Sequence, residues 1–188
     1  MPTSVLPSII GEPVVGLHGH LCRTGVKRGR GVIVIDMLLL GPDDWRHGAK
    51  RLAALAEAAT AFGSTLSDWS GPGDTEQRWR ARLTSVALNI VLTWNGEPAG
   101  MVSATTPGDD GAIELISMWV APFARGHGVG DAAVRRVMAW AQIEHGRSPV
   151  VLSVKANNDP AIRLYRRHGF TDVGPSPNDP DERLMRRT

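Results

Sequence analysis

The chain has 188 residues, of which 42% are hydrophobic and 21% charged, and its net charge is +2. This length allows one well-buried core and does not require two domains. The most apolar run, residues 32–40, is shorter than the roughly 18–20 residues of a membrane span and contains Asp36. Because Cys22 is the only cysteine and the start carries no secretory signal, we expect a cytoplasmic protein without a membrane span or a disulfide.

Residues 1–30 predict an irregular or flexible extension, because they hold five glycines and three prolines and show little periodicity. The remainder, residues 31–188, is expected to form one folded domain. The basic stretch VKRGRG lacks interleaved aromatic side chains, so it is a weak signal for nucleic acid. His18, His20 and Cys22 are closely spaced, but no second group of ligands accompanies them, and we predict no metal site.

Regular patterning begins at Val32. In chain order, the apolar spacing predicts a strand over 32–40, helices over 43–60 and 75–83, and strands over 86–94, 96–106 and 112–120. Asn95-Gly96 is a strong signal for the hairpin turn that joins two of these strands. After a glycine-rich turn, a helix is expected up to Gly146, followed by a strand over 149–155.

The last part of the chain predicts one helix and two short strands. Asp159 and Pro160 resemble a helix start, and Gly169 is placed to end that helix. Short strands are expected over 170–173 and 183–187. The order of elements predicts an α/β (α+β) fold, a mixed sheet with helices on both faces.

The stretch WVAPFARGHGVG ends a strand, turns through three glycines and starts a helix. A helix start leaves backbone N–H groups unpaired and favours anions, and glycines ahead of it let a phosphate approach the backbone. The alternative is a turn whose glycines serve only tight packing. A dinucleotide-binding turn needs G-x-G-x-x-G and a P-loop needs Gly-Lys-Ser/Thr; the sequence has neither.

Two motifs resemble those of the GCN5-related N-acetyltransferases (the GNAT family). ARGHGVG fits the family's R-x-x-G-x-G, with Arg125, Gly128 and Gly130 on its defined positions. VKANNDPAIRLYRRHGF, residues 154–170, fits V-x-x-x-N-x-x-A-x-x-L-Y-x-x-x-G-F. The resemblance covers about residues 32–187. It implies a single-domain, mostly antiparallel sheet of about six to seven strands, splayed between two central parallel strands.

The resemblance also implies the co-substrate acetyl-CoA. The pyrophosphate would be held by the glycine turn, the pantetheine arm would run along the preceding strand, and Asn158 would contact the coenzyme. The residues expected to bind coenzyme are Met118, Trp119, Val120, Arg125, Gly126, His127, Gly128, Val129, Gly130, Asp131 and Asn158. Asp131 departs from expectation, since an acid beside phosphates is unfavourable, and we expect it to point away from them.

Tyr165 and Glu114 are the predicted catalytic residues. By the resemblance, Tyr165 would protonate the leaving thiolate, which a neutral phenol can do at pH 7. Glu114 would deprotonate the acceptor amine, directly or through a water. The alternatives are a core tyrosine on an apolar helix face and an exposed strand residue. Trp45, Trp69 and Trp79 are candidates for the wall of an acceptor pocket.

The acceptor is expected to be a cationic primary amine on a small molecule, a peptide N-terminus or a lysine. Residues 32–120 carry six basic and eleven acidic side chains, whereas residues 121–188 carry eleven basic and seven acidic ones. The acidic part would face the acceptor and the basic part the coenzyme. A non-catalytic acyl-CoA-binding sensor is the alternative, and a nucleic-acid-binding protein ranks last. Members of the family often dimerise, so a homodimer is among the expected assemblies.

Overall fold

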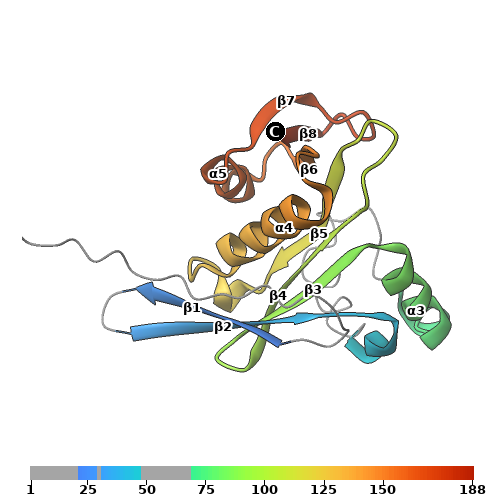
Figure 1. Cartoon of the computed structure of the whole chain (residues 1–188), viewed down its shortest axis with the longest axis vertical. Coiled ribbons are helices and arrows are strands. Elements are labelled where there is room, and N and C mark those ends of the chain that lie inside the picture. Colours follow the sequence, from blue (N-terminus) through green and yellow to red (C-terminus); the bar gives the residue numbers. More distant parts are fainter. Residues whose placement is uncertain (1–20, 29–30, 48–68) are drawn as a thin grey trace, which may run out of the picture.

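The computed structural model describes residues 21–28, 31–47 and 69–188, which build one eight-stranded sheet (Figure 1). Its order is β1-β2-β3-β4-β5-β6-β8-β7, and every neighbouring pair is antiparallel except β5 and β6. The strands are β1 (Leu21–Arg28), β2 (Gly31–Leu39), β3 (Leu88–Trp94), β4 (Glu97–Ala104), β5 (Ile113–Val120), β6 (Val150–Lys155), β7 (Thr171–Pro175) and β8 (Glu182–Arg187). The described helices are η1 (Pro42–His47), η3 (Gly71–Gly73), α3 (Glu76–Ser85), η4 (Pro122–Ala124), α4 (Val129–His145) and α5 (Asp159–Arg167).

The predicted fold class is confirmed, with one strand more than expected. Residues 21–28, predicted to be irregular, form β1 and pair with β2 from Leu21↔Leu38 to Arg28↔Gly31, so the prediction was wrong there. The stretch has no clear alternation of its own, and the pairing covers an edge of β2 that would otherwise be open. Residues 1–20 and most of the helix expected over 43–60 lie outside the described residues; the part that is described forms η1.

Helices cover both faces of the sheet because β3 and β4 are apolar on both sides. Ile90 and Leu92 belong to the main core, where α4 lies across β3, β4 and β5. The alternate residues of β3 point to the opposite face. There Asn89 donates to the carbonyls of Leu83 and Val86, which ties the end of α3 to the sheet.

The helix α4 carries the apolar stripe that the sequence predicts. Val134, Val137 and Ala141 are buried against the sheet. It begins after Gly128, which has the left-handed φ of 87°, and ends at Gly146. These two glycines fix where the helix starts and stops, because other residues enter such conformations at a cost.

The strands β5 and β6 pair over only two positions, Ile113↔Val150 and Glu114↔Val151. Beyond Glu114 they diverge, as the predicted splay requires, and β5 keeps only its antiparallel neighbour β4. One edge of the β5 backbone from residue 115 onward is therefore not covered by a strand.

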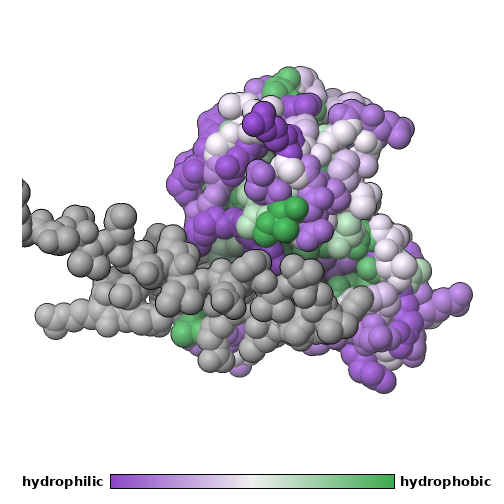
Figure 2. Space-filling view, viewed as in Figure 1, coloured by the Kyte–Doolittle hydropathy of each residue, from purple (hydrophilic) through white to green (hydrophobic). Residues whose placement is uncertain are grey.

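The face drawn in Figure 2 is mostly hydrophilic over the upper lobe, with small hydrophobic patches. In the described part of the chain, the exposed large hydrophobic side chains are Phe123, Ile143 and Val173. None of the helices described there is long and apolar enough to cross a membrane.

Candidate active site

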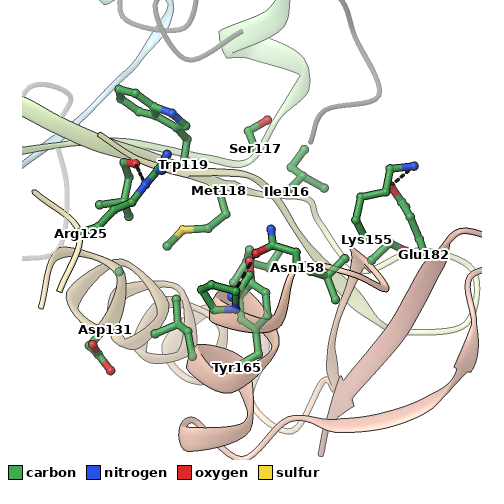
Figure 3. A pocket seen from close by; sticks show the side chains of 18 of the residues that line it. Ile116, Ser117, Met118, Trp119, Arg125, Asp131, Lys155, Asn158, Tyr165 and Glu182 are labelled. Carbon is green, nitrogen blue, oxygen red and sulfur yellow. Dashed lines mark hydrogen bonds and ion pairs between the residues drawn. The ribbon is translucent and has the colours of Figure 1, made fainter. Parts of the chain in front are cut away.

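A cavity of about 1080 Å³ occupies the splay between β5 and β6 (Figure 3). Its walls come from β5, the glycine turn, the start of α4, α5, the end of β6 and one side of α3. Eleven of the thirteen predicted site residues line it: Glu114, Met118, Trp119, Val120, Arg125, Gly126, Gly128, Gly130, Asp131, Asn158 and Tyr165. The structure thus brings together residues that lie up to about fifty positions apart in sequence.

His127 and Val129, the other two predicted coenzyme contacts, do not line the cavity. The ring of His127 stacks on Trp94, with the ring centroids 4.3 Å apart. Val129 is fully buried in the core, next to Gly100 of β4. In the turn, alternate residues face opposite sides, so these two side chains anchor the turn to the sheet while the glycines face the cavity.

The glycines of the turn have distinct physical roles. Gly126 and Gly128 have φ of 77° and 87°, and a Cβ added to either would meet no atom within 4 Å. At these two positions glycine is needed for the backbone conformation, and the space in front of it is open. Gly130 has ordinary φ, but a Cβ there would lie 3.0 Å from Cδ2 of Leu164, so it allows α4 to approach α5 closely.

Charged groups around the turn are tied to neighbouring elements. The Nε of Arg125 donates to the carbonyl of Val120 at 3.1 Å, which links the turn to the end of β5. Asp131 accepts from Arg167 at 3.2 Å and contacts Nε2 of His168 at 3.0 Å. Burial pushes the pKa of Asp131 upward, but the hydrogen bonds from His168 and Arg167 outweigh it and hold the pKa below its usual value. The negative charge of Asp131 is therefore balanced by side chains at the C-terminal end of α5.

The middle of β5 is irregular where it faces the cavity. Its register against β4 shifts between Met101 and Ser103, and Ser117 has a left-handed φ of 55°. The Oγ of Ser117 accepts from Nη2 of Arg82 on α3 at 2.9 Å. A bulge at this point turns the strand, and such irregularities are frequent beside active sites.

Tyr165 projects from α5 into the space between that helix and β5 (Figure 3). Only 5% of the residue is exposed, and its ring packs edge-on against Phe170 with centroids 5.8 Å apart. Burial raises the pKa of the phenol well above its usual value. The phenol oxygen makes no hydrogen bond within the described chain, which is uncommon for a buried polar group.

Asn158 lines the cavity and also caps α5. Its Oδ1 accepts from the amide of Ala161 at 3.3 Å. The sequence pattern predicts Asp159 as the cap, one residue later than Asn158; in the structure Asp159 is instead the first helical residue. Because the cap fixes the side chain, its amide group lies at the cavity wall in a defined orientation.

Glu114 lies at the point where β5 and β6 part. Glu114 is exposed at the wall of the cavity, but its carboxyl is partly desolvated by the surrounding protein. This desolvation is the main cause that raises the pKa of the carboxyl, and the negative charge of Glu182 is the second. Glu182 itself is 3.4 Å from Lys155 (Figure 3). Lys155 also pairs with Asp179. Glu114 has no ion pair within the described chain.

The lining residues that were not identified as site residues from the sequence include Arg82, Ser117 and Lys155. Arg82 lies on a helix 35 positions before Ser117, and no local motif marks either residue. Of the tryptophans considered, Trp69 lines the cavity. Trp79 instead lines a small separate cavity under α3, and Trp45 lines neither of these two cavities.

Comparison with known proteins identifies the family. The profile described as "Acetyltransferase (GNAT) family" matches residues 52–170, and the chain therefore belongs to that family. Its members are acyltransferases that use acetyl-CoA as co-substrate. The predicted family is confirmed.

Relatives and solved structures agree with this assignment. The N-acetylaspartate synthetase of Rattus norvegicus is 36% identical over 86 residues, covering 46% of this chain and only 28% of that protein. A GNAT-family acetyltransferase from Streptococcus pneumoniae superposes with a TM-score of 0.64 at 19% identity, covering 81% of this chain and 98% of that one. The PaiA N-acetyltransferase from Thermoplasma acidophilum, solved in complex with coenzyme A, superposes with a TM-score of 0.61 at 12% identity. This match covers 82% of this chain and 98% of that one. At these identities the two structures show a shared fold.

Proposed function

We propose that the protein transfers an acetyl group from acetyl-CoA to the nitrogen of a primary amine by direct attack. The observation that carries the proposal is the cavity at the splay, which brings the glycine turn, the uncovered edge of β5, Tyr165 and Glu114 to one space. The name of the partly matched relative, N-acetylaspartate synthetase, also describes acylation of an amine.

The residues present fit the coenzyme. The turn offers the first amides of a helix of 17 residues, and glycines with open space before them admit a diphosphate. Asp131, the one acid at the turn, is held by Arg167 and His168 and so repels phosphate less. Arg125 lies at the same end of the cavity, as Figure 3 shows. We assign pyrophosphate binding to the amides of residues 126–131.

The uncovered edge of β5 would hold the pantetheine arm. A strand without a neighbour presents N–H and C=O groups to whatever lies beside it. Met118, Trp119 and Val120 line the cavity on this edge. An amide here would donate to the thioester carbonyl and stabilise the negative charge that develops on its oxygen, a type of contact worth about 3–4 kcal/mol.

Two side chains would move the protons of the reaction. Acetyl-CoA supplies an activated acetyl group; the amine nitrogen forms an amide bond to it while the carbon–sulfur bond breaks. Glu114, directly or through a water, accepts the proton that the nitrogen loses. Tyr165 donates a proton to the sulfur, and its raised pKa keeps the phenol protonated at any pH near neutral.

The direct test is a thiol-release assay with the purified chain, acetyl-CoA and a panel of primary amines. We expect release that depends on the amine and an N-acetylated product in the mass spectrum. Tight binding of coenzyme A with no transfer to any amine would instead support the non-catalytic sensor.

The assignment of Glu114 predicts a specific pH effect. A base works when ionised, so the rate should rise as the pH climbs through the raised pKa of Glu114 and level off above it. Glu114→Gln should lower kcat about 100-fold or more and remove this acidic limb. The measurement is kcat against pH for both proteins. A variant that keeps the full rate across the pH range would contradict the assignment.

A further inference from the structure

The charged side chains that line the cavity are mostly paired with one another. Asp131 is paired with Arg167 and His168, and Lys155 is paired with Asp179 and Glu182. Two lining charges of opposite sign have no ion-pair partner in the described chain, Glu114 and Arg82. We call the part of the cavity lined by Glu114 and Arg82 its acceptor end. It offers one negative and one positive group for a bound molecule.

Arg82 is the less expected of the two. It is half-buried, and burial lowers the pKa of its guanidinium, with no acidic group acting in the opposite direction. Its one side-chain hydrogen bond goes to a neutral hydroxyl, the Oγ of Ser117 at 2.9 Å. A guanidinium has five N–H donors, and a desolvated one without a carboxylate is costly. An anion that enters the cavity would offset this cost.

The position of Arg82 restricts what that anion can be. Ser117 directly precedes Met118, on the strand edge that we assign to the thioester. An anion at Arg82 would thus lie close to the reacting centre and far from the glycine turn that holds the pyrophosphate. Planar guanidinium groups favour carboxylates, which they can bind through two parallel hydrogen bonds.

We propose that Arg82 binds a carboxylate of the acceptor, so that the preferred acceptor is a small amino acid whose amine lies within a few bonds of that carboxylate. This rests on the acetyltransferase function proposed above and narrows its acceptor. The amine enters beside Glu114 and the carboxylate beside Arg82, with Trp69 forming an apolar wall. The acceptor is then cationic only at its amine and not overall.

The chemical step is the one already described. The acceptor's ammonium first loses a proton to Glu114, directly or through a water. The free amine then bonds to the acetyl carbon, the thioester carbon–sulfur bond breaks, and the second proton that the nitrogen loses as the amide forms passes to solvent. The sulfur takes a proton from Tyr165, while the carboxylate is a spectator. Since Arg82 touches a group that does not react, its loss should act mainly on the KM for the acceptor.

The test compares acceptors that differ only in the carboxylate. Free amino acids are assayed with acetyl-CoA against their amides and against the amines that lack the carboxylate. For the best amino acid we expect kcat/KM to exceed that of its amide by about 10- to 100-fold. Arg82→Gln should remove this preference, mostly through KM, and leave the amide's kcat/KM nearly unchanged. Arg82→Lys keeps the positive charge but cannot form two parallel hydrogen bonds to a carboxylate. Its preference for the acid over the amide should lie between those of the parent and Arg82→Gln.

Arg80→Gln is the matched control. Arg80 lies on the same helix but pairs with Asp43 and Glu76 on the surface, away from the cavity. Its loss should change kcat/KM for the amino acid by no more than about twofold, since surface pairs contribute little. An amide, a peptide N-terminus or a lysine side chain used better than any amino acid would overturn the proposal, and so would an equal loss for acid and amide in Arg82→Gln.

A binding experiment separates this inference from the acetyltransferase proposal. Calorimetric titration of the amino acids into the protein saturated with coenzyme A requires no turnover. Binding of an acid, but not its amide, that Arg82→Gln abolishes would support the carboxylate site even if no transfer occurred. Transfer to amines, together with equal binding of acid and amide, would overturn the site and leave the transferase function standing.

Discussion

Tyr165 shows how one residue can be both core and candidate acid. Its ring packs against Phe170 and its exposure is 5%, so the structure supports the packing role that the sequence also allowed. Its phenol oxygen nevertheless has no partner in the described chain and faces the cavity. Packing accounts for the ring, and the proposed proton transfer to the leaving thiolate would account for the hydroxyl.

Tyr165→Phe separates these two roles. The substitution keeps the ring and removes only the hydroxyl, so we expect thermal unfolding within about 2 °C of the parent and kcat lower by about 100-fold or more. Coenzyme A binding, measured by calorimetry, is the control and should be unchanged. A variant with the parent's kcat would remove Tyr165 from the mechanism.

The sequence could mark Tyr165 and Glu114 as candidates because both lie in or near a motif with fixed spacing. It could not mark Arg82, whose proposed role depends on the contact between α3 and the bulge of β5. It also could not show that His127 faces Trp94 or that Val129 faces the core, because side-chain direction in a glycine turn depends on its φ values.

At the scale of elements, the turn before α4 fixes where the helix begins and what its amides face. Gly128 is the N-cap in the left-handed region, and the space beside its Cα is open to the cavity. The same helix ends at Gly146, which also has positive φ but does not line the cavity. The two glycines therefore offer a matched pair of substitutions, one inside the site and one outside.

Gly128→Ala should cost about 1–2 kcal/mol of folding free energy, because alanine resists the left-handed conformation. For a chain of this length the melting temperature should fall by about 2–8 °C. The added methyl would also occupy the space before the amides, so affinity for coenzyme A should fall about 10- to 100-fold. Gly146→Ala should lower the melting temperature and leave that affinity unchanged. Equal affinity in the two variants would contradict the role of the turn.

Most elements were predictable where a segment carries its own pattern. The helix α4, the hairpin of β3 and β4, and the strand β6 follow from apolar periodicity and turn residues. The strand β1 was not predicted because its extended conformation depends on pairing with β2, an interaction that the local sequence does not encode. The bulge at Ser117 was missed for a similar reason, since it arises from the register between two strands.

Across the whole molecule, the sheet consists of two parts joined weakly at the splay. β1 to β5 form one antiparallel part, β6 to β8 the other, and only two residue pairs connect β5 with β6. The cavity between them takes residues from both parts. A ligand that fills it contacts both, so binding should stabilise the whole fold and not one element alone.

Coenzyme A should therefore raise the melting temperature in a way that depends on its pyrophosphate. At about 100 times its Kd a ligand adds about 2.7 kcal/mol, which corresponds to about 5–10 °C for a chain of this length. Pantetheine can lie along β5 but has no diphosphate for the glycine turn, so at equal concentration its shift should be much smaller. In Gly128→Ala the rise in melting temperature caused by coenzyme A should come closer to that caused by pantetheine, because the turn no longer favours the diphosphate. If pantetheine stabilised the parent as much as coenzyme A does, the contacts that bind the coenzyme would lie along the edge of β5. The amides before α4 would then have no part in binding.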